Sequence, residues 1–248
     1  MTHMKKKIVI FSGAGMSQES GLATFRGVGG IWESIDQEKV ADYKAWYCGR
    51  RSDCKERRQA VLDFINPIRR QILSLNPNEA HYVTARLEKD FDVTVITQNG
   101  DDFHQRAGSS KVIHLHGEAL KNASTLHPYI PLEIDPENPD IRIGDKAPDG
   151  SQIRPYVIFF NEDLQYDIWK SAVQAIREAD MMVIVGCSLK VSPAAEMVEE
   201  LSEEASLVVI DPAEPPFPIK RTYAHLKLPA SKGMKIMEET LLEQTKLE

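Results

Sequence analysis

The chain has little cysteine, no excess of basic residues and no long apolar run. Its three cysteines, Cys48, Cys54 and Cys187, cannot make a disulfide framework and fit a reducing compartment. No stretch approaches the roughly 20 apolar residues of a membrane helix, and the first apolar run leads straight into a glycine turn. The 37 acidic side chains outnumber the 30 basic ones, which argues against nucleic-acid binding by phosphate neutralisation. We therefore expect a cytoplasmic enzyme or small-molecule binder with no membrane or nucleic-acid partner.

Short apolar, β-branched runs recur along the 248 residues. Runs this uniformly apolar are typical of strands covered on both faces, as in a parallel sheet between helices. Residues 78–89 and 166–179 carry apolar side chains at helical spacing. The alternation predicts an α/β fold, a Rossmann-like doubly wound parallel sheet. The six predicted strands are residues 7–11, 93–97, 111–115, 156–160, 181–185 and 207–210.

Two segments break this rhythm. Residues 28–70 are charged and helix-prone, and residues 118–154 are rich in proline, aspartate and glycine. We predict that they pack together as a small second domain. The Rossmann-like domain would then comprise residues 1–27, 71–117 and 155–248.

A glycine turn follows the first predicted strand. Gly13, Ala14 and Gly15 precede Ser17, and glycines here let the backbone turn tightly and bring amides up to a pyrophosphate. A plain strand-to-helix turn is the alternative. The acidic residue that usually reads a dinucleotide ribose about 20 positions later is not clearly placed, so the turn departs from the standard fingerprint.

Five segments, in family order, resemble the motifs of the sirtuins, the NAD-dependent protein-lysine deacylases. The resemblance implies removal of an acyl group from a lysine of a protein or peptide, with NAD as cofactor and with nicotinamide and O-acyl-ADP-ribose as products. The matching segments are GAGMSQESGLATFRG at 13–27, TQNGDDFHQRAG at 97–108, HLHG at 114–117, RPYVIFFNE at 154–162 and GCSLKVSPAA at 186–195.

The resemblance assigns the nicotinamide end of the cofactor to two segments. Asp101 would accept from the nicotinamide carboxamide, while Gln98 and Asn99 hold the ribose and a water molecule. Phe25 would cover the nicotinamide, and Arg26 would lie near the phosphates.

A histidine completes the implied catalytic set of His116, Asn99 and Asp101. A histidine ordinarily titrates near neutrality, so His116 suits a general base that activates a ribose hydroxyl. His114 alternates with it along the strand, so we expect a structural role for His114, and a packing role for His104.

The adenosine end is implied by the last matching segment and the strand after it. Gly186 and Ser188 permit close approach of adenosine, although a plain turn is the alternative. Asp211 stands where the family commonly has an asparagine against the adenosine ribose, and its carboxylate can accept from both hydroxyls.

The substrate site is implied by the fourth segment. Ile158 would offer its carbonyl to the acyl-lysine amide, and Phe160 and Val191 would line the acyl tunnel. Asn161 replaces the usual glycine.

Most sirtuins carry a zinc module with two cysteine pairs after the catalytic histidine. This chain has no cysteine between Gly117 and Arg154, and the only histidine there is His127. One ligand cannot make a tetrahedral zinc site, so we predict no metal.

The resemblance implies that residues of the first insertion select the acyl group. Tyr47 and Arg50 have the spacing of the pair that binds acidic acyl groups in some sirtuins, but the family position falls nearer to Ile65 and Ile68. We therefore favour an apolar acyl group.

Two other functions stay open. The same pocket can hydrolyse NAD or transfer ADP-ribose to a protein, and the altered Asn161 and the insertion without cysteines favour that alternative. A non-catalytic NAD or ADP-ribose sensor is the third possibility, against which the retained His116 argues. The sequence does not determine the protein substrate or the oligomeric state.

Overall fold

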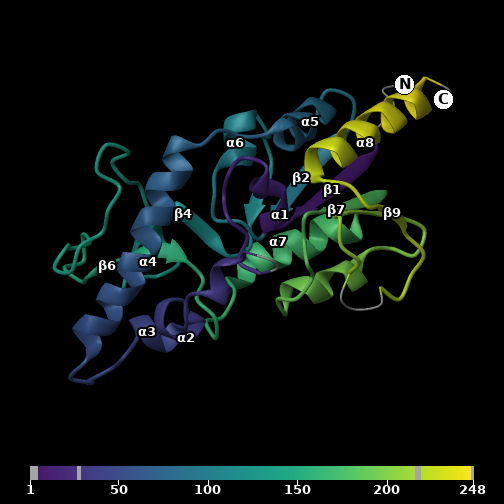
Figure 1. Cartoon of the computed structure of the whole chain (residues 1–248). Coiled ribbons are helices and arrows are strands. Elements are labelled where there is room, and N and C mark those ends of the chain that lie inside the picture. The colour runs from purple at the N-terminus through teal and green to yellow at the C-terminus, as the bar shows by residue number, and fades with distance from the viewer. Residues whose placement is uncertain (1–4, 27–28, 216–218, 247–248) are drawn as a thin grey trace.

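The structure, a computed structural model, describes residues 5–26, 29–215 and 219–246. It has a larger lobe around a parallel sheet and a smaller lobe around an antiparallel one (Figure 1). The described ends of the chain lie close together on the larger lobe, beside the last helix (Figure 1).

The parallel sheet has six strands in the order β3-β2-β1-β7-β8-β9. Alternate side chains of its central strands enter two apolar cores, one on each face. Helices α5 and α8 cover one face, and α7 and the 3-10 helix η2 cover the other, so the sheet is doubly wound. The elements are β1 (Lys7–Ser12), β2 (Asp92–Thr97), β3 (Val112–His114), β7 (Met181–Val185), β8 (Ser206–Ile210), β9 (Ala224–Leu226), α5 (Glu79–Leu87), α7 (Tyr166–Arg177), η2 (Ala194–Glu200) and α8 (Ala230–Thr245). Two short helices, α1 (Ala14–Gln18) and α6 (Phe103–Ala107), follow β1 and β2.

The smaller lobe has three antiparallel strands in the order β5-β4-β6. Its helix α4 packs against β4, and a core formed by Trp46, Leu62, Ile141 and Phe159 joins chain segments far apart in sequence. The elements are η1 (Ile31–Glu33), α2 (Gln37–Val40), α3 (Tyr43–Trp46), α4 (Cys54–Ser74), β4 (Gly117–Ser124), β5 (Pro131–Leu132) and β6 (Ile153–Val157).

The predicted domain boundaries cross continuous elements. Helix α4 runs through residue 70, and β6 runs through residue 154. The first boundary, between residues 27 and 28, lies outside the described residues.

One predicted strand of the parallel sheet is wrong. The apolar run at 156–160 begins inside β6, which pairs antiparallel with β4. Val157 and Phe159 are apolar because they pack into the core of the smaller lobe. An apolar run indicates that a strand is buried, but it does not indicate which strand it pairs with.

The cysteine prediction also needs correction. Cys48 and Cys54 form a disulfide with Cα atoms 5.5 Å apart, between α3 and α4. Cys187 is free and buried. The cysteines therefore no longer argue for a reducing compartment.

Among the described residues, no helix has both the length and the apolar character needed to span a bilayer.

Candidate active site

The carboxyl ends of five parallel strands meet at one edge of the sheet. The residue just after each strand donates its backbone N–H to the last carbonyl of a neighbouring strand, at 2.9–3.2 Å. Side chains that follow different strands are therefore held side by side at this edge, where open α/β sheets bind ligands. The five residues are Gly13, Gln98, Leu115, Gly186 and Asp211.

The β1–α1 turn lies directly on the end of β7. Gly15 donates its N–H to the Gly186 carbonyl at 2.9 Å. A Cβ on Gly13 would stand 2.7 Å from the same oxygen, and one on Gly186 (φ +55°) would stand 2.3 Å from the Met16 nitrogen. Glycine is required at both positions, because no side chain fits between two backbones at this separation.

The Ser17 hydroxyl, in α1, links the side chains of Asn99 and Asp101. The Asn99 amide donates to the Gly13 carbonyl at 2.9 Å and to the Ser17 hydroxyl at 3.1 Å. Ser17 donates in turn to Asp101 at 2.8 Å. Burial raises the pKa of Asp101, and the hydrogen bond from Ser17 opposes this shift. The structure thus brings together three predicted site residues from two separate motifs.

A buried polar network beneath this group was not found from the sequence. His104 contacts the Ser12 hydroxyl at 3.0 Å, and Ser12 donates to the Thr97 hydroxyl at 2.8 Å. Thr97 accepts from the Asn99 backbone at 3.1 Å. Burial holds the pKa of His104 well below its usual value. The small polar residues that end β1 and β2 are the only sequence signal for this network, which fixes the backbone of Asn99.

His116 lies between the two sheets. Its Nδ1 contacts the Gln98 carbonyl at 3.2 Å, so Nδ1 carries the proton and Nε2 is left with a lone pair. The His116 carbonyl accepts from the Ile158 N–H at 2.9 Å, which ties the histidine to the chain that follows β6. Burial lowers the pKa of His116. Gly117 comes next at φ +78°, where a Cβ would stand 2.3 Å from the Tyr156 oxygen.

A buried ion pair holds the chain that follows β6. The Arg154 guanidinium donates to both Glu162 oxygens at 2.7 and 2.8 Å and to the Val157 carbonyl. Its ion pair with Glu162 raises the pKa of Arg154 against the opposing effect of burial. Glu162 also accepts from the Phe159 N–H at 2.9 Å. The predicted substrate residues 158–160 lie inside the loop that this pair closes.

Phe160 and Asn161 both contact the start of α3. The Phe160 backbone exchanges hydrogen bonds of 2.8 Å with the Ala41 carbonyl and the Tyr43 N–H. Asn161 has φ +63°, and its amide donates to Asp42. Asparagine tolerates this left-handed backbone, which explains how it can replace a glycine here.

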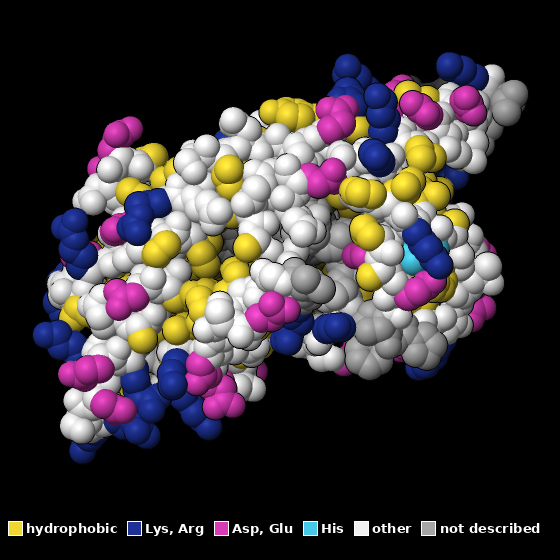
Figure 2. Space-filling view, viewed as in Figure 1, with side chains coloured by type: hydrophobic (Ala, Val, Ile, Leu, Met, Phe, Trp, Pro, Cys, Tyr) yellow, Lys and Arg dark blue, Asp and Glu magenta, His cyan; other side chains and the backbone are white. Residues whose placement is uncertain are grey.

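Aromatic rings connect Phe25 to Phe160. Trp32 lies 5.4 Å from Phe25 and 5.5 Å from Phe64 in stacked geometry, and 6.3 Å from Phe160 edge-on, between ring centroids. Figure 2 shows hydrophobic side chains gathered near the middle of the face shown, toward the smaller lobe. Arg26 is exposed, and its guanidinium donates to the Gln37 side chain at 3.5 Å.

The predicted adenosine residues lie at the ends of β7 and β8. Ser188 is exposed, and Asp211 accepts from the Ala213 N–H at 2.8 Å. Val191 is half-buried and begins the turn into η2, where its carbonyl accepts from the Ala195 N–H at 2.9 Å.

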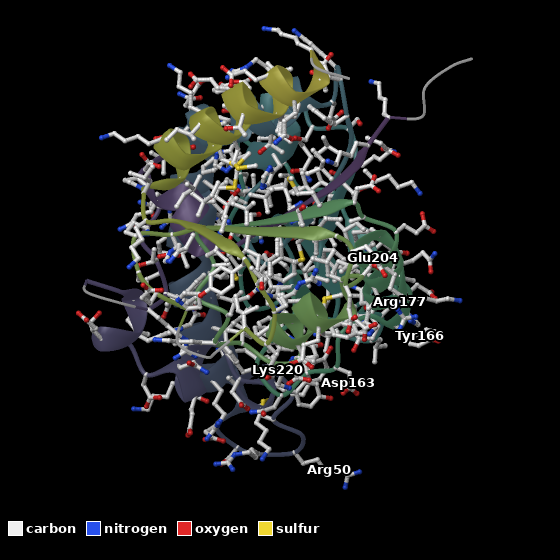
Figure 3. All side chains as sticks on the ribbon, turned by 90° about the vertical axis from the view of Figure 1, so that its right-hand side faces the viewer. Arg50, Asp163, Tyr166, Arg177, Glu204 and Lys220 are labelled. Carbon is white, nitrogen blue, oxygen red and sulfur yellow. A yellow bond between two sulfur atoms is a disulfide. The ribbon has the colours of Figure 1, made fainter. Side chains whose placement is uncertain are left out.

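The structure does not build an acidic-acyl site from Tyr47 and Arg50. The Tyr47 hydroxyl donates to the Thr125 carbonyl and accepts from Arg154, both at 2.9 Å. Arg50 is exposed and points away from the molecule, whereas Asp163, which follows the ion-paired loop, lies nearer the centre (Figure 3).

Hydrogen bonds order the segment between Gly117 and Arg154, in which we predict no metal. Ser124 donates to Asp149, contacts the Ser151 hydroxyl at 2.8 Å and accepts from the Leu126 N–H at 3.0 Å. His127 is exposed, with Nε2 4.0 Å from Asp149. In the described parts of the chain, no three side chains are grouped as metal ligands.

Comparison with known proteins agrees with this geometry. The Sir2 family profile matches residues 13–193. An NAD-dependent protein deacylase of Bacteroides thetaiotaomicron is 40% identical over 241 residues, which cover 96% of this chain and 98% of the relative. One of Helicobacter pylori is 42% identical over 207 residues, which cover 84% and 83%.

Solved structures share the whole fold. A mutant Sir2 homologue in complex with ADP-ribose has a TM-score of 0.85 at 30% identity, with 98% of this chain and 95% of that chain covered. A Sir2 protein with a deacetylated p53 peptide and 3′-O-acetyl ADP-ribose has a TM-score of 0.77 at 30% identity, with 95% and 94% covered. On its sequence, its fold and the residues at its sheet edge, the chain belongs to the Sir2 family.

Proposed function

We infer that this chain is an NAD-dependent protein deacylase. The observation that carries the inference is the meeting of Asn99, Asp101 and His116 at one sheet edge, with the Ile158 N–H bonded to the His116 carbonyl. The proposed cofactor site and the segment that follows β6 thus adjoin one histidine. The related deacylases span nearly the same length of chain, which supports the same activity here.

The residues at this edge fit NAD. The glycines of the β1–α1 turn leave its backbone without side chains, and the buried carboxyl of Asp101 offers an acceptor for an amide. Asp211, which follows β8, presents a carboxylate at the same edge of the sheet. Ribose hydroxyls need such an acceptor. When bound, NAD supplies the nicotinamide–ribose bond whose cleavage accompanies transfer of the acyl group. We propose that Phe25 covers the nicotinamide end of the site and that Arg26 lies near the phosphates, as the family resemblance implies.

His116 suits the general base. Because Nδ1 donates to the Gln98 carbonyl, the tautomer is fixed with Nε2 as acceptor. A lowered pKa keeps the ring neutral at neutral pH, which is the form that can take a proton from a hydroxyl. Asn99 is held by the Gly13 carbonyl and the Ser17 hydroxyl, so its position does not depend on a ligand.

We propose that the substrate is an acyl-lysine of a protein, bound along residues 158–160. Phe160 and Val191 would line the acyl tunnel, and the Ile158 carbonyl would accept from the acyl amide. Ile65 is buried in the apolar core of the smaller lobe, and Ile68 packs against it. Because Arg50 is exposed and does not join Tyr47 in a site for an acidic acyl group, these apolar residues support an uncharged acyl group.

We also propose the two-domain division drawn from the sequence, with the smaller domain ordered by hydrogen bonds such as those of Ser124 and without a metal. A cytoplasmic location fits the dependence on NAD.

The test is nicotinamide release from NAD by the pure protein, with acetyl-, longer acyl- and succinyl-lysine peptides and without peptide. We expect release that depends on peptide, with uncharged acyl groups preferred. His116→Ala should lower the rate by about 100-fold or more, while His127→Ala, at an exposed histidine, serves as the matched control. Release that is equal with and without peptide would replace the deacylase with an NAD glycohydrolase or ADP-ribosyltransferase.

A further inference from the structure

Cys187 packs between the β1–α1 turn and the residue that follows β2. It is 5% exposed and follows Gly186 at the end of β7. A Cβ on Gly13 would stand 2.8 Å from the Cys187 Cα and 3.0 Å from its Cβ. On the other side, the Gln98 amide nitrogen lies 3.2 Å from Sγ. One side chain therefore touches both segments that the proposed NAD site brings together.

The sulfur acts as a hydrogen-bond acceptor in this position. It receives an N–H of the Gln98 amide. Burial raises the pKa of the Cys187 thiol to about 12, so the group stays neutral and does not act as a nucleophile near neutral pH. Its part in the site is geometric.

An acceptor behind Gln98 decides which end of the carboxamide faces outward. A carboxamide has an NH2 donor end and a carbonyl acceptor end on opposite branches of one planar group. With the NH2 end bonded to Sγ, the carbonyl oxygen is the end left for a ligand. Ribose hydroxyls need such an acceptor, whereas a flipped amide would present donors.

We propose that Cys187 is a positioning residue, which orients the Gln98 carboxamide so that its carbonyl oxygen receives a ribose hydroxyl of NAD. The inference rests on the proposed function and deepens it. A thiol is a weak hydrogen-bond donor, so the sulfur favours the orientation in which the Gln98 amide nitrogen donates to it.

The experiment measures binding of NAD and, separately, of ADP-ribose by calorimetry without any peptide. C187V keeps the volume of the side chain and removes the acceptor, whereas C187S keeps an acceptor. We expect C187V to weaken both ligands about five-fold, as for one lost hydrogen bond, and C187S to restore most of the loss. In a Q98A background, C187V should cause no further loss, because the group that it orients is gone.

Three results decide the matter. Unchanged affinity in C187V, or additive losses in C187V and Q98A, would overturn the inference alone. A wild-type protein that binds neither ligand would overturn the proposed function together with this inference. Thermal unfolding of each variant checks that it folds, and C187A repeats the test if C187V does not.

Discussion

Removal of the Glu162 carboxylate should destabilise the whole protein, because it leaves the Arg154 charge buried without its partner. The two side chains are 1% and 3% exposed, so water cannot replace the lost contact. Breaking a buried, hydrogen-bonded ion pair from one side costs about 3–5 kcal/mol of unfolding free energy. In a chain of this length, that corresponds to a fall in Tm of roughly 6–20 °C. The lost ion pair closes the loop that carries residues 158–160, so this loop is where the structure is weakened.

The assay is equilibrium unfolding of Glu162→Ala in urea, followed by circular dichroism, beside a matched surface variant. Arg177 and Glu200 also form an ion pair at 2.7 Å, but their side chains are 60% and 37% exposed. Glu200→Ala should therefore cost less than about 1 kcal/mol. Peptide KM should rise in Glu162→Ala, since the Phe159 N–H loses its acceptor. If the two variants lose the same small amount of stability, the reasoning is refuted.

Three further outcomes are expected from other parts of the molecule. Gly117→Ala should cost at least about 2 kcal/mol, because φ is +78° and a Cβ would overlap a backbone oxygen; an unchanged urea midpoint would contradict this. Burial lowers the pKa of His81 to about 4, so its contribution is complete above pH 6.5 and is lost as pH falls toward 4, by about 3 kcal/mol. His81→Gln keeps an acceptor for the Asn78 N–H and should show a shallower loss between pH 7 and 4.5; parallel curves would refute the assignment. Reduction of the Cys48–Cys54 disulfide should lower the unfolding free energy by about 2 kcal/mol, with no effect of reductant on the double serine variant.

Local pattern predicted the strands of the parallel sheet well. Apolar runs at 7–11, 93–97, 181–185 and 207–210 correspond to β1, β2, β7 and β8, and the run at 111–115 contains β3. The central strands β1, β7 and β8 are buried on both faces by helices, and double burial leaves a continuous apolar signal. The three-residue β9 lies at the sheet edge with partly exposed side chains, so it leaves almost none.

The continuous apolar signal gave a wrong prediction at residues 156–160, which do not form a strand of the parallel sheet. Burial in the smaller lobe gives Val157 and Phe159 the same apolar character as a strand of the parallel sheet. Tyr47 and Arg50 have the separation of an acyl-binding pair, but in the sequence that position falls nearer to Ile65 and Ile68. The fold gives the Tyr47 hydroxyl to Arg154 and Thr125, and leaves Arg50 in solvent.

The sequence by itself determined the fold class and the chemical groups at the sheet edge. Parallel strands bring their carboxyl ends together, so Asn99, Asp101 and His116 are neighbours in any fold with this strand order. Only the tertiary structure decided which groups touch: the Ser17 bridge from Asn99 to Asp101, the Gln98 carbonyl on His116, and the sulfur behind the Gln98 amide. The physical reason is that periodicity and turn chemistry act over a few residues, whereas these contacts join segments about 20 to 90 residues apart in the chain.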